Sequence, residues 1–126
     1  MPSDDVTSSM SIHTDPIDFD ALLEMLGGDK LIIASLLKTF LDELSAGVEE
    51  VRRALDSDNR EAGRQLAHRI KGTSANLQAS PLSAAARALE LACAEEDGSG
   101  LASAGEALVA EAERLTAAIE SWLEAE

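Results

Sequence analysis

The spacing of apolar residues is the feature that most constrains how this chain can fold. Between about residues 29 and 55, apolar side chains recur every three or four positions, which places them on one face of an α-helix. The spacing returns in later segments, and no segment shows the apolar–polar alternation of a strand. Aromatic residues make up only 2% of the chain, and alanine and leucine dominate its apolar fraction, which also favours helices. The sequence therefore predicts an all-α fold.

Capping residues predict where the first two helices begin and end. A short helix is expected at residues 18–26, with Asp18 as its N-cap and Gly27-Gly28 as its end, because glycine adopts the left-handed conformation without steric cost. Asp29 should cap a longer helix over residues 29–55. The apolar spacing continues through position 47, so one bent helix is expected there rather than two.

Three further helices follow from similar signals. Asp58 and Glu61 have the spacing of a capping box, so a helix is expected to begin there and to end near residue 78. Ser80 and Pro81 should be the N-cap and first residue of the next helix, and the last should follow the Gly-Ser-Gly loop at 98–100. Long amphipathic helices with short loops predict an antiparallel four-helix bundle with an additional short N-terminal helix.

Two regions of the chain differ in composition. Residues 1–15 are rich in Ser, Asp and Thr and are expected to form a flexible tail, in which His13 is a solvated residue. Residues 16–126 are expected to form a single bundle domain, with Cys93 and Trp122 packed on its apolar faces. No signal peptide is recognised, no apolar run reaches the ~18 residues of a membrane span, and a lone cysteine fits a reducing compartment. We therefore expect a cytoplasmic location.

Charge limits the classes of partner. The formal net charge is -14, which argues against nucleic acid or an anionic membrane as the main partner. Seven of the 10 Lys and Arg residues nevertheless lie between positions 52 and 87, with only three acidic residues among them. This basic region suggests a local electrostatic task within an acidic protein.

His68 is the candidate reactive residue of the helix expected at residues 58–78. On a helical wheel, Leu66, Ile70 and Leu77 cluster and define the buried face, whereas His68 falls on the side that faces away from it. The phase of the helix therefore disfavours a buried structural histidine. It leaves open whether His68 is functional or an idle surface residue.

The neighbours of His68 favour a functional role. Arg60, Arg64 and Lys71 lie on the same helical stripe, and such a basic stripe would suit a phosphoryl group and an acidic partner site. Gly72, one turn beyond His68, costs helix stability, but it would leave a bare patch beside the imidazole for another protein to approach. An alternative is that Arg60 and Arg64 only balance nearby acidic residues on the helix surface.

Glu90 is expected to lie beside His68. Residues at equal distances from the turn of an antiparallel hairpin lie at the same level, and His68 and Glu90 are equidistant from residue 79. A carboxylate there could accept a hydrogen bond from Nδ1–H of His68 and leave Nε2 as the nucleophile. The alternative is a solvated glutamate on the helix surface.

The ten-residue run at positions 68–77, HRIKGTSANL, closely resembles the signature of histidine-phosphotransfer (HPt) domains, His-x-hydrophobic-Lys-Gly-small-small-x-x-hydrophobic. Other segments match the family as well, namely Gly27-Gly28-Asp29, the spacing of Leu37 and Phe40, and Leu89-Glu90. The resemblance covers about residues 17–123. Gln78 departs from it, because many relatives have glycine at this position.

The resemblance implies a phosphocarrier of a multistep phosphorelay in two-component signalling. His68 would accept a phosphoryl group from the aspartate of a receiver domain, or from a hybrid sensor histidine kinase, and pass it to a response regulator. Lys71 would help to bind the phosphoryl group and Glu90 would orient the imidazole. No cofactor is expected in this chain, and Mg²⁺ is expected in the partner receiver domain.

Partner binding is expected at Arg60, Arg64, Gly72 and Gln78, in a monomer. An autonomous kinase is disfavoured because the chain has no Gly-x-x-x-x-Gly-Lys phosphate loop, and a metal site is disfavoured because the only histidines are isolated. The dimerisation helix of a sensor kinase is disfavoured because Arg69, not an acidic residue, follows the histidine. A helical adaptor that binds receiver or kinase domains without phosphotransfer remains the alternative.

Overall fold

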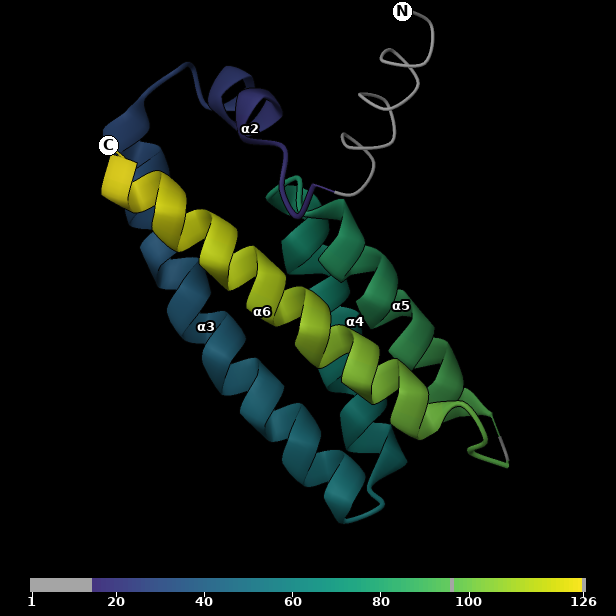
Figure 1. Ribbon diagram of the computed structural model, residues 1–126. Helices are drawn as coiled ribbons and strands as arrows, with labels where there is room; N and C mark the ends of the chain where they lie inside the picture. Colours follow the sequence, from purple (N-terminus) through teal and green to yellow (C-terminus); the bar gives the residue numbers. More distant parts are fainter. Residues whose placement is uncertain (1–14, 96, 126) are drawn as a thin grey trace, which may run out of the picture.

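The structure is a computed structural model that describes residues 15–95 and 97–125 (Figure 1). Within those ranges the chain forms helices and no strands, which confirms the all-α prediction. The helices are α2 (Phe19–Met25), α3 (Lys30–Asp56), α4 (Arg60–Asn76), α5 (Ser80–Ala94) and α6 (Leu101–Ala125). The predicted tail, except its last residue, and His13 lie outside the described residues.

The four long helices form an antiparallel bundle, as expected. Each of α3, α4, α5 and α6 packs against two neighbours, in the cyclic order α3, α4, α5, α6. The short helix α2 lies across one end of the bundle, near the N-terminus of α3 and the C-terminus of α6 (Figure 1). None of the helices in the described ranges has the length and apolar character needed to cross a membrane.

The core is almost entirely aliphatic, because the apolar faces of all five helices converge on it. Each fully buried leucine or isoleucine contributes about 1.5–3 kcal/mol through removal of its side chain from water. The largest fully buried hydrophobic side chains are Leu22, Ile33, Leu37, Val51, Leu82, Leu89, Leu108, Leu115 and Ile119. Cys93 is buried, and Trp122 packs against the core and stacks on Phe19 with ring centroids 5.4 Å apart. Both residues therefore have the packing role that their helical phase predicts, and the stacked rings hold α2 against α6.

The predicted ends of α2 and the start of α3 are confirmed. Oδ1 of Asp18 accepts a hydrogen bond from the backbone N–H of Ala21, and Oδ1 of Asp29 accepts two from the first turn of α3. Gly27 and Gly28 end α2 with φ values of +71° and +77°. The helix α3 continues without interruption from Lys30 to Asp56, so the expectation of one helix rather than two is confirmed.

The predicted starts of α4 and α5 are each wrong by one residue. Asn59, not Asp58, caps α4 through its side chain, and the backbone N–H of Asp58 bonds to Leu55 instead of completing a capping box. Asp58 has a φ of +58° because it ends α3, with the pair of backbone hydrogen bonds typical of a Schellman motif. Ala79 is the N-cap residue of α5, without a side-chain hydrogen bond, so Ser80 is its first residue.

The buried face of α4 is also displaced from the prediction. The buried positions are Gly63, Ala67, Ile70, Ser74 and the C-cap residue Leu77, whereas Leu66 is only partly buried. Small residues form much of this face, whereas the helical-wheel prediction rests on large apolar residues. The predicted buried face therefore lies about 40° around the helix from the observed one. His68 remains on the exposed side in either case.

We expect Gln78→Gly to stabilise the protein by about 0.5–1 kcal/mol. Gln78 follows the C-cap of α4 with a φ of +63°, a conformation that costs a residue with a Cβ about 1–2 kcal/mol. Glycine at this position would relieve that cost. The flexibility of glycine in the unfolded chain offsets part of the relief. Urea unfolding measures the difference. Gln78→Ala is the matched control because it keeps the Cβ, and equal stabilities of the two variants would contradict relief of backbone strain.

Candidate functional site

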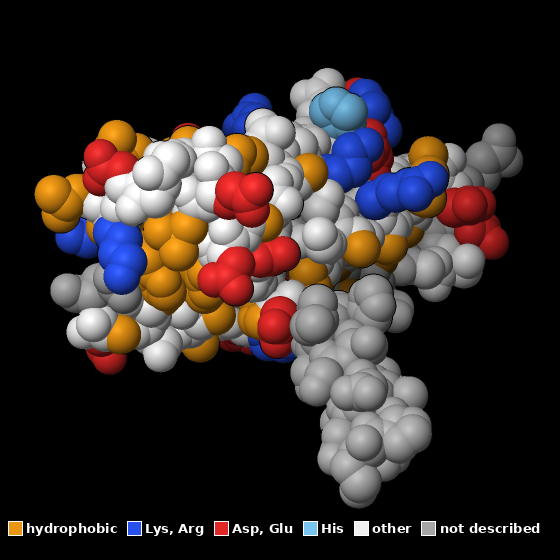
Figure 2. All heavy atoms as spheres, turned by 90° about the horizontal axis from the view of Figure 1, so that it is seen from above, with side chains coloured by type: hydrophobic (Ala, Val, Ile, Leu, Met, Phe, Trp, Pro, Cys, Tyr) orange, Lys and Arg blue, Asp and Glu red, His pale blue; other side chains and the backbone are white. Residues whose placement is uncertain are grey.

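His68 projects from the middle of α4 into solvent. Its side chain is 64% exposed, and it lies on the side of the helix opposite the buried residues. Figure 2 shows this histidine in pale blue at the edge of the molecule, beside Lys and Arg side chains. The expectation of an exposed imidazole is therefore confirmed.

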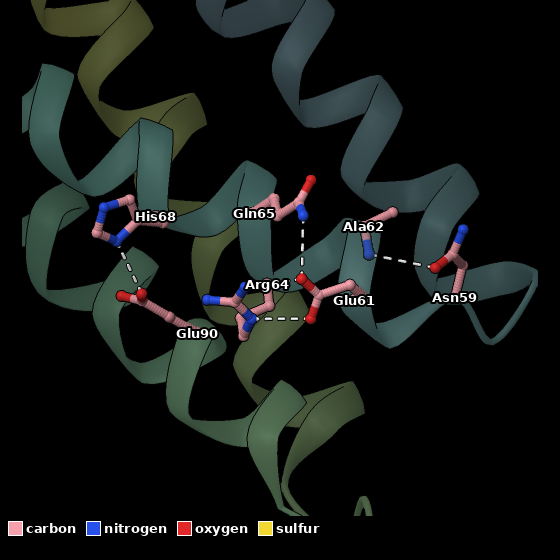
Figure 3. Close-up of polar contacts among 7 residues, drawn as sticks. All are labelled: Asn59, Glu61, Ala62, Arg64, Gln65, His68 and Glu90. Carbon is pink, nitrogen blue, oxygen red and sulfur yellow. Dashed lines mark hydrogen bonds and ion pairs between the residues drawn. The ribbon is translucent and has the colours of Figure 1, made fainter.

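Glu90 of α5 joins His68 to Lys71. Its Oε2 lies 2.8 Å from Nδ1 of His68, and its Oε1 accepts a hydrogen bond of 2.8 Å from Nζ of Lys71. Glu90 is itself only 17% exposed, and Figure 3 shows its carboxylate pointing from α5 toward the imidazole on α4. The contact inferred from the hairpin is confirmed, and the solvated alternative for Glu90 is excluded.

This arrangement determines which imidazole nitrogen carries the proton. The hydrogen bonds from Lys71 and, to a smaller extent, from His68 lower the pKa of Glu90 below its ordinary value, so its carboxylate is ionised near neutral pH. An ionised carboxylate can only accept hydrogen bonds, and Nδ1 of His68 must therefore be the protonated nitrogen. In a neutral imidazole this leaves a lone pair on Nε2, to which no described residue bonds.

We expect the pKa of the Glu90 carboxyl group to lie below its ordinary value, because Lys71 and His68 bond to it. Because its pKa is lowered by folding, Glu90 stabilises the protein above that value, and the contribution is lost as pH falls through the lowered pKa. NMR titration of the side-chain carboxyl measures the midpoint. Lys71→Met should raise it more than His68→Gln does, and a wild-type midpoint at or above the ordinary value would contradict the geometry.

The hairpin of α4 and α5 holds these three side chains in register. Ala79, Ala86 and Leu89 are completely buried and bring the two helices close together. Oγ of Ser83 also donates a hydrogen bond of 3.0 Å to the backbone carbonyl of Lys71 and ties α5 to α4 one turn from the histidine. Sequence patterns did not single out Ser83, because its partner is a backbone atom on another helix.

Gly72 leaves an open surface beside His68. It is exposed, and a Cβ built on it would meet no side chain or other helix within 4 Å, apart from its two neighbours in the chain. A side chain at this position would therefore not clash within the protein, and glycine is not required for packing. The bare patch predicted from the sequence is present.

Arg60 and Arg64 do not extend the basic stripe as expected. Arg64 forms a forked pair with Glu61, with contacts of 3.0 and 2.7 Å, and Figure 3 shows it turned toward that residue. Nη1 of Arg60 donates to the backbone carbonyl of Glu95 at 2.6 Å, and its Nε lies 3.8 Å from Asp58. This geometry favours local charge balance, the alternative interpretation, and partner binding by either arginine stays a prediction.

Gln78 lies at the end of α4, away from His68. Ten residues of helix separate the two, or about 15 Å along the axis. The backbone carbonyl of Gln78 accepts a hydrogen bond of 3.0 Å from the backbone N–H of Asp18, and its side chain reaches Met25 of α2. Its position thus relates to the packing of α2, and its role in partner choice stays a prediction.

Arg87 is a further basic residue near the site that the sequence patterns did not single out. It lines a shallow groove between α4 and α5 together with Lys71. The hairpin rule that pairs His68 with Glu90 also pairs Lys71 with Arg87, since their midpoint is again residue 79. The signal was therefore present in the sequence.

The site can act as a nucleophile without a metal ligand set. Residues 15–95 and 97–125 contain no group of three His, Cys, Asp or Glu side chains that could hold a metal ion. What they do contain is an exposed imidazole whose Nδ1 faces a carboxylate, together with an adjacent ammonium group bonded to the same carboxylate. These groups suit attack on an electrophile with anionic oxygens.

Comparison with known families agrees with this arrangement. The model of the Hpt domain family matches residues 35–125, which include α4, α5, α6 and most of α3. No curated protein and no solved structure gives a significant match to the chain. The matched region covers well over half of the sequence and contains His68, Lys71 and Glu90, and the chain therefore belongs to the Hpt domain family.

Proposed function

We propose that this protein is a histidine phosphocarrier of a multistep phosphorelay, with His68 as the phosphoacceptor. The observation that supports this most strongly is the 2.8 Å contact between Nδ1 of His68 and Glu90 on an otherwise exposed imidazole. It directs the lone pair of Nε2 to solvent, where a second protein can reach it. Membership of the Hpt domain family supports the same chemistry.

The transfer step needs no proton movement in this chain. Nε2 of His68 attacks phosphorus in line, the N–P bond forms, and the bond between phosphorus and the carboxylate oxygen of the partner's phosphoaspartate breaks. The aspartate leaves as a carboxylate, and the imidazole ring gains positive charge. Glu90 stabilises this charge through Nδ1–H, which stays bonded throughout. Donation to a second receiver follows the reverse course.

Lys71 is the residue that we assign to the phosphoryl oxygens. Its ammonium group is bonded to Glu90, so it is held beside the imidazole before the partner arrives. An ammonium group is a flexible point charge that can turn to a phosphoryl oxygen without a change of backbone. Lys71 thus links the carboxylate that orients the nucleophile to the group that is transferred.

The partners that fit this chemistry are receiver domains of response regulators and of a hybrid sensor histidine kinase. We place the Mg²⁺ ion and most of the stabilisation of the transition state in the receiver, which makes this chain a carrier without kinase activity of its own. A cytoplasmic location and a monomeric state complete the proposal. A single exposed His68 on a closed bundle suffices for transfer without a second subunit.

Incubation with a receiver domain that carries a ³²P-labelled phosphoaspartate tests the proposal. The label should move to this chain and then to a second, unlabelled receiver. A helical adaptor gives a different result, because it would form a complex with the receiver while remaining unlabelled. Complex formation without label would therefore overturn the proposed function.

We expect Gly72→Gln to slow transfer without weakening the fold. Glycine costs about 1 kcal/mol in a helix relative to alanine, and the site has room for a side chain, so helix stability should stay equal or rise. The glutamine side chain would occupy the surface that the partner must approach. Rapid-quench transfer assays measure the effect, and Gly72→Ala should be intermediate. A wild-type transfer rate for Gly72→Gln would remove the access role of Gly72.

A further inference from the structure

A long groove runs between α3 and α6, on the face of the bundle opposite the His68 site. Because the long helices pack in the cyclic order α3, α4, α5, α6, the face formed by α3 and α6 is opposite the face formed by α4 and α5 (Figure 1). Two hollows in this face share Arg52, Val109 and Glu113 and therefore form one groove. It extends over residues 41–56 of α3, which is about 22 Å or about four helical turns. We name this surface the α3–α6 groove.

The floor of the α3–α6 groove is apolar. On α3, Leu41, Val48 and Leu55 are spaced seven positions apart and are only partly buried, so they form one line along the helix. On α6, Leu101 and Val109 line the same groove and are also partly buried. A line of apolar residues with this spacing is the kind of surface on which a further amphipathic helix packs.

The borders of the α3–α6 groove are acidic. Among the described residues that line it, Arg52 is the one cation, against five exposed carboxylates, those of Glu49, Asp56, Glu106, Glu113 and Glu120. None of the five carboxylates has an ion-pair or side-chain hydrogen-bond partner within residues 15–95 and 97–125. A basic partner can therefore engage them without breaking a contact inside the bundle.

The charge of the groove determines which kind of partner complements it. Like charges brought together at an interface weaken binding, so an acidic protein surface, a nucleic acid and an anionic membrane are all repelled. Residues 1–14 of this chain include two aspartates and no Lys or Arg, and the whole chain has a net charge of -14. Neither that segment nor a second copy of the chain therefore complements the groove as a basic partner does.

We infer that the α3–α6 groove binds a basic amphipathic helix of about four turns from another protein. The apolar stripe of that helix packs on the line of Leu41, Val48 and Leu55, and its Lys and Arg side chains lie beside the carboxylates at the borders. This inference goes beyond the proposed function and does not depend on it. Because His68 is on the opposite face, the protein can hold such a partner while its imidazole stays accessible.

Charge reversal at two adjacent positions of α3 tests the role of the acidic borders. The probe is a fluorescent helical peptide of roughly 16 residues, with leucines along one face and lysines on both flanks. Glu49→Lys should raise its Kd at least about fivefold in fluorescence anisotropy, whereas Glu50→Lys should change it less than about twofold. Both residues are exposed, but Glu49 lines the α3–α6 groove and Glu50 lines the groove between α3 and α4. The two variants have the same net charge, so only a local effect distinguishes them.

A second pair of variants tests the shape of the groove without a change of charge. Ala110 and Ala107 are both exposed on α6, and of the two only Ala110 lines the groove. Ala110→Gln would occupy the space that the peptide needs and should raise its Kd at least about threefold. Ala107→Gln should leave the Kd within about twofold of the wild type. Circular dichroism checks that all four variants keep their helicity.

NMR titration of the ¹⁵N-labelled protein with the same peptide locates the binding surface. Backbone amides of α3 and α6 that border the groove should shift, whereas those of His68 and Gly72 should not. Shifts confined to α4 and α5, no binding by the wild type, or equal affinities of Glu49→Lys and Glu50→Lys would each overturn the inference. Self-association of the wild type that Glu49→Lys abolishes in sedimentation velocity would also overturn it, because the groove would then bind a second copy. All these readouts are independent of phosphoryl transfer.

Discussion

His68→Gln is expected to abolish phosphoryl acceptance while leaving the fold intact. The substitution removes Nε2, the nucleophile of the proposed reaction, so no N–P bond can form. The side chain is largely exposed, and substitutions at such positions usually change stability by less than about 0.5 kcal/mol. Transfer from a labelled receiver and urea unfolding measure the two effects.

Loss of phosphoryl acceptance at unchanged stability is the result expected of a phosphoacceptor. A structural histidine would lose stability together with activity, whereas His68→Gln should lose only activity. Gln65→Ala is a suitable control, because Gln65 is also exposed on α4 and bonds only to Glu61. Label on His68→Gln at the wild-type level would contradict the assignment of His68.

Glu90→Ala is expected to slow transfer roughly 10- to 100-fold, by analogy with the loss that follows removal of a carboxylate that orients a metal-bound histidine. The alanine variant loses both the acceptor for Nδ1–H of His68 and the anchor of Lys71. The imidazole can then rotate or change tautomer, and Nε2 is presented less often in the reactive form. Glu90→Gln should be intermediate, because its amide oxygen still accepts one hydrogen bond but carries no charge. Single-turnover transfer measures the rates.

Glu61→Ala is the matched control for Glu90→Ala. Glu61 is another glutamate with side-chain hydrogen bonds, to Arg64 and Gln65 on its own helix, and it makes no contact with His68. Removal of the Glu61 carboxylate should change the transfer rate little. If the two alanine variants transfer equally fast, the contact between Glu90 and His68 has no part in the reaction.

The parts of the site that follow from regular helix geometry could be predicted from the sequence. The phase of α4 placed His68 on the exposed side, because a helix repeats about every 3.6 residues whatever its surroundings. The tight turn between α4 and α5 fixed the register of the hairpin, and this register placed Glu90 beside His68. The match of residues 68–77 to the signature of a family drew attention to the same positions.

The parts that depend on side-chain conformation or on distant backbone atoms could not be predicted in this way. Helical spacing placed Arg60 on the stripe of His68, but the carbonyl of Glu95, 35 positions later, holds it elsewhere. The one-residue shift at Asp58 arises because the end of α3 requires a left-handed residue before α4 can begin. The buried face of α4 was misplaced because its core positions include Gly63 and Ser74, which apolar periodicity does not count.

The most direct test is to locate the phosphoryl group on the protein after transfer from a phosphorylated receiver. ³¹P NMR distinguishes phosphorylation of the two imidazole nitrogens, and tandem mass spectrometry under neutral or alkaline conditions identifies the modified residue. The account predicts one phosphoryl group per chain, on Nε2 of His68. A phosphoryl group on Nδ1, on another residue, or on none would contradict it.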